Sequence, residues 1–379
     1  MNCVERPRVV LCAPGFPAST DDSDKPFLLD HAVALTRAGL DVIVVCPSIP
    51  GLPSHQVVAG VEVIRVRYAP RRFETLAATG SMYREAKSRK GVWALPMVAA
   101  MTVAAIRQLR INTTIAYGHW WIPGGLVAAI AARCVRRPSL VHVHGSDAAI
   151  TQSAALRFVA RKVLSSVNVR LAVSEELADW AQELCGHPVQ VLPMPLVFER
   201  FPAPSPPPEE GYIMAVGRLV PEKGFDVLID AVGLLNQSQR PKVTIIGVGP
   251  ERQRLAEQAR RRAVDVHLPG AVSPHQMSDW YQNARYVVVP SRREGFGLVA
   301  AEAAAMSRAV VGTKVGGIST VVKDGISGIL VKPDDPQGLA QALLRIDPAM
   351  GESGPSIVAA LSSENHGAHI RQVCEDLLK

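Results

Sequence analysis

The sequence has few of the features that mark disulfide-rich, metal-stapled or membrane-spanning proteins. Its six cysteines are scattered, with no C-x-x-C pair and no Cys/His cluster at zinc spacing, which excludes a disulfide scaffold and a zinc finger. The longest apolar stretch, Val92–Ile106, has 15 residues and contains Pro96, whereas a bilayer-spanning helix needs about 20. The first residues hold only a four-residue apolar run and no signal-peptide core. We therefore expect a cytoplasmic protein without a transmembrane helix.

What remains is the composition of a globular protein. Of the 379 residues, 48% are hydrophobic and 20% charged, which excludes a disordered chain, and the length suggests two or three domains. The net charge of +7 lies entirely in the first half. Residues up to Ala203 carry 22 Lys and Arg against 15 Asp and Glu, and the remainder carries 19 of each. Much of the excess lies between Arg65 and Lys90.

A proline-rich stretch, Pro202–Glu210, divides the sequence. Proline fixes φ and lacks a backbone donor, so we interpret this stretch as a stiff linker. We divide the chain into a first domain at 1–203, a second domain at 204–360 and a C-terminal helix at 361–379. We expect this last helix to pack back on the first domain.

Short β-branched runs alternate with helical patterns on both sides of the linker. In the first domain the expected strands are Val9–Cys12, Val42–Cys46, Val61–Val66, Thr113–Tyr117, Leu140–Val143, Val169–Val173 and Val189–Leu192. In the second they are Tyr212–Val216, Val243–Ile246, Val266–Leu268, Tyr286–Val289, Val310–Gly312 and Gly328–Val331. This alternation predicts an α/β protein with two Rossmann-like, doubly wound parallel sheets. Ligands of such sheets bind beyond the carboxyl ends of the strands, so we expect the site in a cleft between the domains.

Two glycine-containing loops follow strands of the second domain. In the first loop Arg218 and Lys223 flank a helix start, where free N–H groups and two cations suit a diphosphate. The alternative is a solvated basic turn. The second loop, Gly247–Glu251, contains Gly249 but lacks the third glycine of a dinucleotide fingerprint, so a tight βα turn is the alternative there.

Two glutamates, Glu294 and Glu302, lie eight residues apart around a Gly-Phe-Gly helix entry. Glu302 falls in an otherwise small, apolar helix, where a carboxylate makes sense if it accepts hydrogen bonds from vicinal hydroxyls such as those of a ribose. Glu294 suits the hydroxyls of a second sugar, and the amides of Gly295–Leu298 suit a phosphate. The alternative is an exposed helix residue and a helix-start acid favoured by the dipole.

In their order and spacing these segments resemble the C-terminal domain of the retaining GT-B glycosyltransferases of the glycogen-synthase-like, group 1 type. Arg218 and Lys223 match the basic pair of that family, and Glu294 and Glu302 match its E-x7-E motif. The resemblance implies a GT-B fold, with Glu302 on the nucleotide ribose and Glu294 on the transferred sugar. The segments Val315–Ile318 and Asp324–Val331 match the family segments C-terminal to that motif.

The first domain resembles the family more loosely. His144 stands in an H-G-S-D sequence, and the resemblance implies that it contacts the hydroxyls of the donor sugar. The loop from Gly118 to Gly125 matches a less specific position, which places His119 and Trp120, together with Asp147, on the acceptor side. The alternatives are a structural histidine and a core tryptophan.

Two segments depart from the family pattern. Met306–Ala309 stands where the family has a glycine and a proline, so that turn is expected to differ in shape. In the first loop, Gly15 is followed at 18–25 by three aspartates and no glycine pair. These acids would repel a diphosphate unless they face the acceptor. Asp22-Ser23-Asp24 is formally a D-x-D motif, but its position does not favour a metal site.

The predicted function is transfer of a hexose from a nucleotide diphosphate sugar, with UDP-sugar favoured over GDP-sugar, to an acceptor hydroxyl with retention and without metal or other cofactor. The catalytic set is Glu294, His144, Arg218 and Lys223. The donor-binding set is Gly15, Arg218, Lys223, Gly249, Glu294, Gly295, Phe296, Gly297, Leu298 and Glu302, and the acceptor-side set is His119, Trp120 and Asp147. The alternatives are an epimerase or phosphorylase on the same fold, and a non-catalytic nucleotide-sugar-binding module.

The basic segment 65–93 mixes cations with aromatic residues beside an apolar run. This pattern suits peripheral docking on an anionic membrane, at the inner face of the plasma membrane, or recognition of an anionic acceptor. The alternative is a solvated surface. No nucleic-acid-binding motif accompanies the positive charge, so we expect no nucleic-acid partner.

Overall fold

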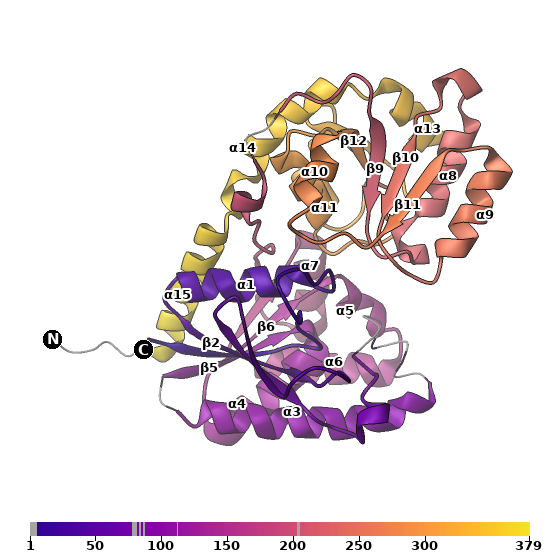
Figure 1. Ribbon diagram of the computed structural model, residues 1–379. Coiled ribbons are helices and arrows are strands. Elements are labelled where there is room, and N and C mark those ends of the chain that lie inside the picture. The colour runs from indigo at the N-terminus through magenta and orange to yellow at the C-terminus, as the bar shows by residue number, and fades with distance from the viewer. Residues whose placement is uncertain (1–5, 78–81, 83–84, 86–87, 112, 203–204) are drawn as a thin grey trace. The chain divides into compact units, whose positions relative to one another are not determined.

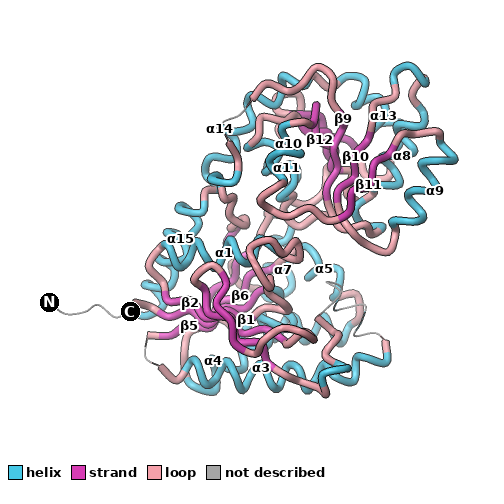
Figure 2. Tube along the Cα trace, in the orientation of Figure 1, coloured by secondary structure: helices cyan, strands magenta, loops and turns pink. Residues whose placement is uncertain are grey.

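The computed structural model describes residues 6–77, 82, 85, 88–111, 113–202 and 205–379. The chain forms two compact units (Figure 1). Unit 1 comprises Met1–Pro195 and Ser363–Lys379, and unit 2 comprises Leu196–Ser362. Strands form the centre of each unit and helices its outer layers, as the tube view of Figure 2 shows.

Unit 1 is built on an eight-stranded sheet of order β3-β4-β2-β1-β5-β6-β7-β8. Every neighbouring pair is parallel except β3 and β4. The strands are β1 (Arg8–Cys12), β2 (Asp41–Pro47), β3 (His55–Val58), β4 (Val61–Val66), β5 (Thr114–His119), β6 (Ser139–Val143), β7 (Val169–Ala172) and β8 (Gln190–Val191). The central strands β1, β5 and β6 are buried on both faces because helices cover both.

The helices of unit 1 form two layers. They are α1 (Pro26–Arg37), α3 (Ala94–Leu109), α4 (Leu126–Val135), α5 (Gly145–Ile150), α6 (Ala154–Ser166), α7 (Glu175–Cys185) and α15 (Ser363–Leu378). Helices α1 and α15 share one buried apolar cluster with the sheet, and α3 and α4 share another on the opposite face. The C-terminal helix α15 is therefore part of the core of unit 1.

Unit 2 contains a six-stranded parallel sheet of order β11-β10-β9-β12-β13-β14. Its strands are β9 (Tyr212–Val216), β10 (Val243–Ile246), β11 (Val266–Gly270), β12 (Ala284–Val289), β13 (Val310–Thr313) and β14 (Gly328–Val331). Its helices are α8 (Phe225–Leu234), α9 (Arg252–Arg262), α10 (Met277–Gln282), α11 (Leu298–Ala305), α12 (Ile318–Val321), α13 (Pro336–Arg345) and α14 (Gly354–Val358). Helices α8, α9 and α13 contribute to the main apolar cluster.

The expected α/β class with two parallel Rossmann-like sheets is confirmed. Sequence reasoning missed β3, because three of its four side chains are not buried and it lacks a buried apolar run. The division of the chain also differs from the expected one at 203. Unit 1 ends at Pro195, before the proline-rich stretch Pro202–Glu210, because Leu196 already pairs with Leu361 and Ser362 of unit 2.

One described segment, Arg89–Leu109, is long and apolar enough to cross a membrane by length and composition. It exceeds the apolar run expected from sequence because a short helical turn at Arg89–Trp93 leads directly into α3. Helix α3 is also a structural layer of unit 1, since Met97, Met101 and Leu109 lie in the core beneath the sheet. That role favours a helix that remains packed on the sheet.

Candidate functional site

In unit 2 the predicted residues gather on loops that leave the carboxyl ends of β9 and β12. Lys223 and Glu294 are 71 residues apart, yet the Lys223 Nζ donates to Glu294 Oε2 at 2.6 Å. The Ser291 hydroxyl donates to the same oxygen at 3.2 Å, and the Gly295 N–H to Oε1 at 3.2 Å. Arg218 lies exposed on the loop after β9. Parallel strands deliver these groups to one edge of the sheet, so a cation and a carboxylate meet there.

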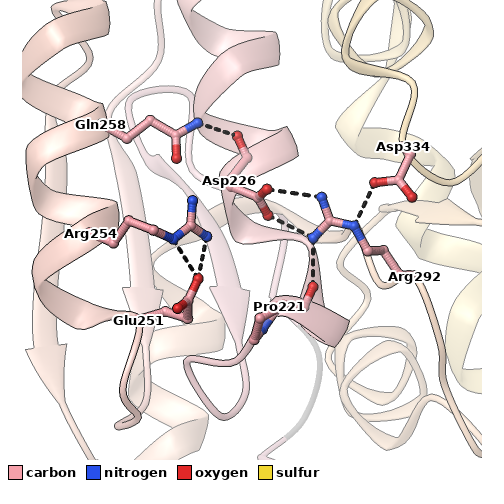
Figure 3. Close-up of polar contacts among 7 residues, drawn as sticks. All are labelled: Pro221, Asp226, Glu251, Arg254, Gln258, Arg292 and Asp334. Carbon is pink, nitrogen blue, oxygen red and sulfur yellow. Dashed lines mark hydrogen bonds and ion pairs between the residues drawn. The ribbon is translucent and has the colours of Figure 1, made fainter.

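Arg292 holds the two loops together (Figure 3). Its guanidinium donates to both carboxylate oxygens of Asp226 on α8, at 2.8 and 2.9 Å, and to the Pro221 carbonyl at 2.6 Å. It also donates to Asp334 at 2.5 Å. Burial acts to raise the pKa of Asp226, but the hydrogen bonds and charge of Arg292 outweigh it and lower that pKa. Sequence analysis gave Arg292 no role. The structure makes it the residue that fixes the Lys223 turn against the Glu294 loop.

Two glycines allow these loops to approach closely. A Cβ on Gly249 would lie 2.3 Å from the Leu219 carbonyl oxygen, so the β10 loop can sit on the β9 loop only with glycine there. Gly316 has φ of +53°, and a Cβ on it would lie 2.0 Å from the Glu294 carbonyl oxygen. Gly249, which was predicted to bind the donor, thus lets two loops pack together, and Gly316 packs against the backbone of Glu294.

Glu302 lies on α11, and its Oε2 accepts a hydrogen bond from the Tyr281 hydroxyl at 2.7 Å. Tyr281 is fully buried, and burial, followed by the charge of Glu302, raises its pKa well above the ordinary value. At the start of the helix Gly297 has φ of +91°, and Phe296 is buried, so only its backbone can face a ligand. The first N–H groups of α11 have no partner within the helix, which makes this end suitable for a phosphate.

Arg308 lies in the segment Met306–Ala309, where the sequence departs from the family pattern. Its side chain is buried and donates to the carbonyl oxygens of Tyr281 and Gln282, at 2.8 and 2.9 Å, and of Ser205 at 2.7 Å. The turn therefore holds the end of α10, which carries the partner of Glu302. In this chain the Arg308 guanidinium fills the space beneath the turn.

In unit 1 the loop after β1 carries Gly15. Lys25, which the sequence analysis overlooked, lies beside it: a Cβ on Gly15 would be 3.5 Å from the Lys25 Nζ. Lys25 forms an ion pair with Asp24, and Asp22 accepts the N–H groups of Ala18 and Asp24. Two of the three loop acids are thus engaged within the loop. The expected repulsion of a diphosphate is reduced because Lys25 places a cation next to Gly15.

The loops after β5 and β6 bring the remaining predicted residues together. Trp120 stacks against His144 with ring centroids 4.3 Å apart, and its indole N–H donates to the Ser146 hydroxyl at 2.9 Å. The His144 Nε2 lies 2.9 Å from the His119 Nδ1. Trp120 is half-buried, so it presents part of its ring at the surface of this loop.

Two acceptor-side expectations need correction. His119 and Asp147 are both fully buried, so neither offers a surface atom to an acceptor. The Asp147 carboxylate instead accepts the N–H groups of Trp121 and His144, at 3.3 and 2.8 Å, and closes the loop. Burial raises the pKa of Asp147 well above the ordinary value, although these hydrogen bonds act to lower it. His144 itself is only 5% exposed.

His119, His142 and His144 are the three described side chains whose ligand atoms lie close enough to hold a metal ion, all within 4.8 Å. Both nitrogens of His142 are already engaged, with the Tyr117 hydroxyl at 2.9 Å and the Leu192 carbonyl at 2.8 Å. A metal would have to displace these bonds and the one between His119 and His144. We therefore interpret the cluster as a hydrogen-bonded one.

Two Rossmann-like sheets and these loops define a GT-B enzyme, and comparison with known proteins gives its family. A model described as "Glycosyl transferases group 1" matches residues 210–346, and one described as "Glycosyl transferase 4-like domain" matches 26–196. Together they cover most of the sequence. The chain belongs to the group 1 glycosyltransferases.

Relatives and solved structures agree with this assignment. TuaC of Bacillus subtilis, named as a teichuronic acid biosynthesis glycosyltransferase, is 28% identical over 88% of this chain and 87% of its own. A D-inositol 3-phosphate glycosyltransferase of Jonesia denitrificans is 40% identical, but over only 36% of this chain and 34% of its own. Sucrose-phosphate synthase from Thermosynechococcus elongatus superposes with a TM-score of 0.78, at 20% identity, over 98% of this chain and 99% of its own. HepE from Anabaena, solved with UDP-glucose, gives 0.73 at 16% identity, over 97% and 99%.

Proposed function

We propose that this glycosyltransferase moves a hexose from a nucleotide diphosphate sugar, with UDP-sugar favoured, to an acceptor hydroxyl, with retention of configuration and without a metal. The observation that carries the proposal is the meeting of Lys223 and Glu294 at 2.6 Å beside the N-terminal end of α11. In one small region this supplies a cation for a diphosphate, a carboxylate for sugar hydroxyls and backbone N–H groups for a phosphate.

In the proposed reaction the acceptor oxygen forms a bond to the anomeric carbon. The bond from that carbon to the donor phosphate breaks, and the acceptor proton is released. Negative charge develops on the departing nucleoside diphosphate, and Arg218, Lys223 and the end of α11 are placed to stabilise it. The half-buried ion pair gives Lys223 a fixed position before the donor arrives, which limits the reorganisation needed in the transition state.

The choice of donor and the role of Glu302 rest on two further observations. HepE shares the fold and is solved with UDP and with UDP-glucose, which favours a uridine nucleotide. The Tyr281 hydroxyl donates to Glu302 Oε2 and orients the carboxylate, whose oxygens are acceptors of the kind that the two hydroxyls of a ribose need.

The decisive experiment is release of nucleoside diphosphate without acceptor from a panel of uridine, guanosine, adenosine and thymidine diphosphate sugars. We expect slow hydrolysis of one donor, lost in Glu302→Ala and reduced about ten- to a hundredfold in Tyr281→Phe, because one hydrogen bond to a charged group contributes about 1.5–3 kcal/mol. Release of product without nucleoside diphosphate would indicate an epimerase instead. Neither release nor thermal stabilisation by any nucleoside diphosphate would indicate a binding module.

We further propose that unit 1 docks on an anionic membrane through the outer face of α3 and the turns before it. This surface exposes Val92 (70%), Leu95 (81%) and Val103 (49%). At its edge Phe73 stacks on Trp93 with centroids 5.8 Å apart. An apolar outer face is unusual for a surface helix and typical of one that lies in a membrane interface.

Charge favours the same orientation. Arg71, Arg72, Arg89 and Lys90 are exposed beside the apolar face, whereas Glu74 is buried. Arg65, counted in the basic segment, is also buried and donates to the Phe16 and Pro17 carbonyls, so it adds nothing to this surface. Arg84 and Lys87 of the same segment lie outside the described residues.

Vesicle sedimentation tests the membrane proposal. We expect binding to vesicles containing phosphatidylglycerol to fall about a hundredfold in Arg71→Gln/Arg72→Gln/Arg89→Gln, since each surface cation contributes about 1 kcal/mol. Leu95→Gln should weaken it further. The matched control is Phe158→Gln/Arg161→Gln, which removes an exposed aromatic residue and a cation from α6. Equal loss in the control, or binding that ignores salt, would contradict the proposal.

A further inference from the structure

Five imidazoles lie together in unit 1, and the family resemblance gives only one of them, His144, a role at the donor sugar. His119 is on β5, His142 on β6, His144 at the start of α5, His31 on α1 and His366 on α15, and all five are buried. His119 pairs in register with His142, and residues two apart on a strand point to the same face, which places these rings beneath α1 and α15.

The cluster is uncharged at neutral pH. Burial, which is the main cause at every position, lowers the pKa of His142 to about 4 and that of His366 to about 3. It also lowers the pKa of His31, His119 and His144 well below 6.5. Each neutral ring carries one N–H and one lone pair, so the hydrogen bonds at the ends of the cluster determine the tautomers between them.

At the end formed by α15, the His366 Nδ1 lies 3.0 Å from the Pro193 carbonyl oxygen. A carbonyl only accepts, so the proton is on His366 Nδ1 and Nε2 is an acceptor. The His31 Nδ1 lies 2.8 Å from this Nε2 and must donate to it. The His31 Nε2 is therefore left as an acceptor.

At the other end, the backbone N–H of Asp147 donates to the His144 carbonyl oxygen at 2.9 Å and is also directed at the His144 ring, in a capping box. The His144 Nε2 faces His119, so the accepting ring atom is Nδ1 and the proton is on Nε2. His144 then donates to the His119 Nδ1 at 2.9 Å. The His119 proton is accordingly on Nε2, where it is a donor.

The two deductions meet in the middle. His31 Nε2 and His119 Nε2 are the two ring nitrogens that, within the described part of the chain, are buried without a hydrogen-bond partner. Their rings face each other edge to face, with centroids 4.6 Å apart. One nitrogen offers a lone pair and the other a proton, so the two halves of the cluster are complementary.

We propose that His119, His31 and His366 form a neutral hydrogen-bond relay that, together with the backbone N–H of Asp147, holds His144 in one tautomer and positions its loop, so that α15 is linked to His144. In the proposed relay every donor points the same way, from Asp147 through His144 to His119 and from His31 through His366 to the Pro193 carbonyl. The step from His119 Nε2 to His31 Nε2, which is not bonded in the structure, is the one that the proposal adds. The functional role assigned to the relay rests on the proposed function, since it acts through His144. The relay itself does not rest on that function.

His142 provides a matched control. It is as buried as His119 and is its cross-strand neighbour, but its hydrogen bonds go to Tyr117 and the Leu192 carbonyl, outside the relay. Replacing it removes a core imidazole without interrupting the proposed chain of donors.

The first test is the ring ¹⁵N spectrum of the free, full-length protein labelled at histidine, at pH 7.5. We expect the Nδ1–H tautomer for His31 and His366, and the Nε2–H tautomer for His119 and His144. In His31→Phe the last two should become mixtures. In His31→Gln, which keeps an acceptor near the Nε2 position, they should stay as in the wild type. A different tautomer for His119 or His366 in the wild type would overturn the relay.

The second test is steady-state kinetics with the donor identified above. We expect kcat to fall on the order of tenfold or more in His31→Phe with little change in donor KM, to recover in His31→Gln, and to change less in His142→Phe. If both Phe variants are folded by circular dichroism and lose kcat equally, the histidines contribute only core packing and the relay is contradicted. If the wild type turns over no sugar nucleotide, the proposed function fails. The tautomers measured by ¹⁵N spectroscopy still test whether the relay exists.

Discussion

Unit 1 should lose stability steeply as the pH falls from 7 to 5. The five buried histidines have lowered pKa values in the folded state, against about 6.5 when unfolded, so the unfolded state binds more protons below pH 6.5. Their stabilising contribution is therefore fully present above pH 6.5 and is lost as the pH falls towards the folded values. Taken together, these groups should lower the free energy of unfolding by several kcal/mol between pH 7 and pH 5, although the raised pKa of Asp147 acts in the opposite sense.

Urea unfolding at several pH values measures this drop. Tryptophan fluorescence reports mainly on unit 1, which holds four of the five tryptophans, Trp93, Trp120, Trp121 and Trp180. Removing one titrating ring, as in His366→Leu, should make the drop smaller by about 2 kcal/mol, whereas the exposed His187→Gln should not change it. Stability that stays level down to pH 5.5 would show that the rings are charged, or reach solvent, in the folded state.

Lys223→Ala and Glu294→Gln should each reduce kcat/KM for transfer by about a hundred- to a thousandfold. In the proposed reaction Lys223 is a preorganised cation for the leaving diphosphate, and removing one such group has this order of effect. Glu294→Gln loses the charge that holds Lys223 and that we propose holds the sugar hydroxyls. Donor binding, measured by calorimetry, should weaken more in Lys223→Ala than in Glu294→Gln.

Arg292→Ala extends this prediction, because Arg292 touches no predicted ligand group and acts only by fixing the two loops. It should lower kcat/KM on the order of a hundredfold. The control is Arg254→Ala, which removes an exposed ion pair with Glu251 on α9 in the same unit (Figure 3). Such surface pairs contribute about 0–1 kcal/mol, so activity should stay near wild type. Comparable losses in the control would contradict the site as described.

The sequence allowed most of the parallel strands to be located, because a strand buried on both faces must be a continuous apolar run. Tyr212–Val216, Val243–Ile246 and Gly328–Val331 have the predicted bounds, and α15 lies within the expected C-terminal segment 361–379. The exposed strand β3 lacked this pattern. Lys223 and Glu294 could also be identified from the sequence, because the family motifs are recognised by residue type and spacing along the chain.

Only the tertiary structure decided which polar groups contact one another. Arg292, Tyr281 and Lys25 belong to no motif, and their partners are far away in sequence or set by backbone geometry. Burial likewise removed His119 and Asp147 from the acceptor side, since local sequence does not reveal what covers a loop. The sequence by itself determined the fold class, because periodicity and composition are local properties, and it indicated the residues that we propose bind a sugar nucleotide. The positioning of those residues depends on contacts between distant segments, which only the packed sheets establish.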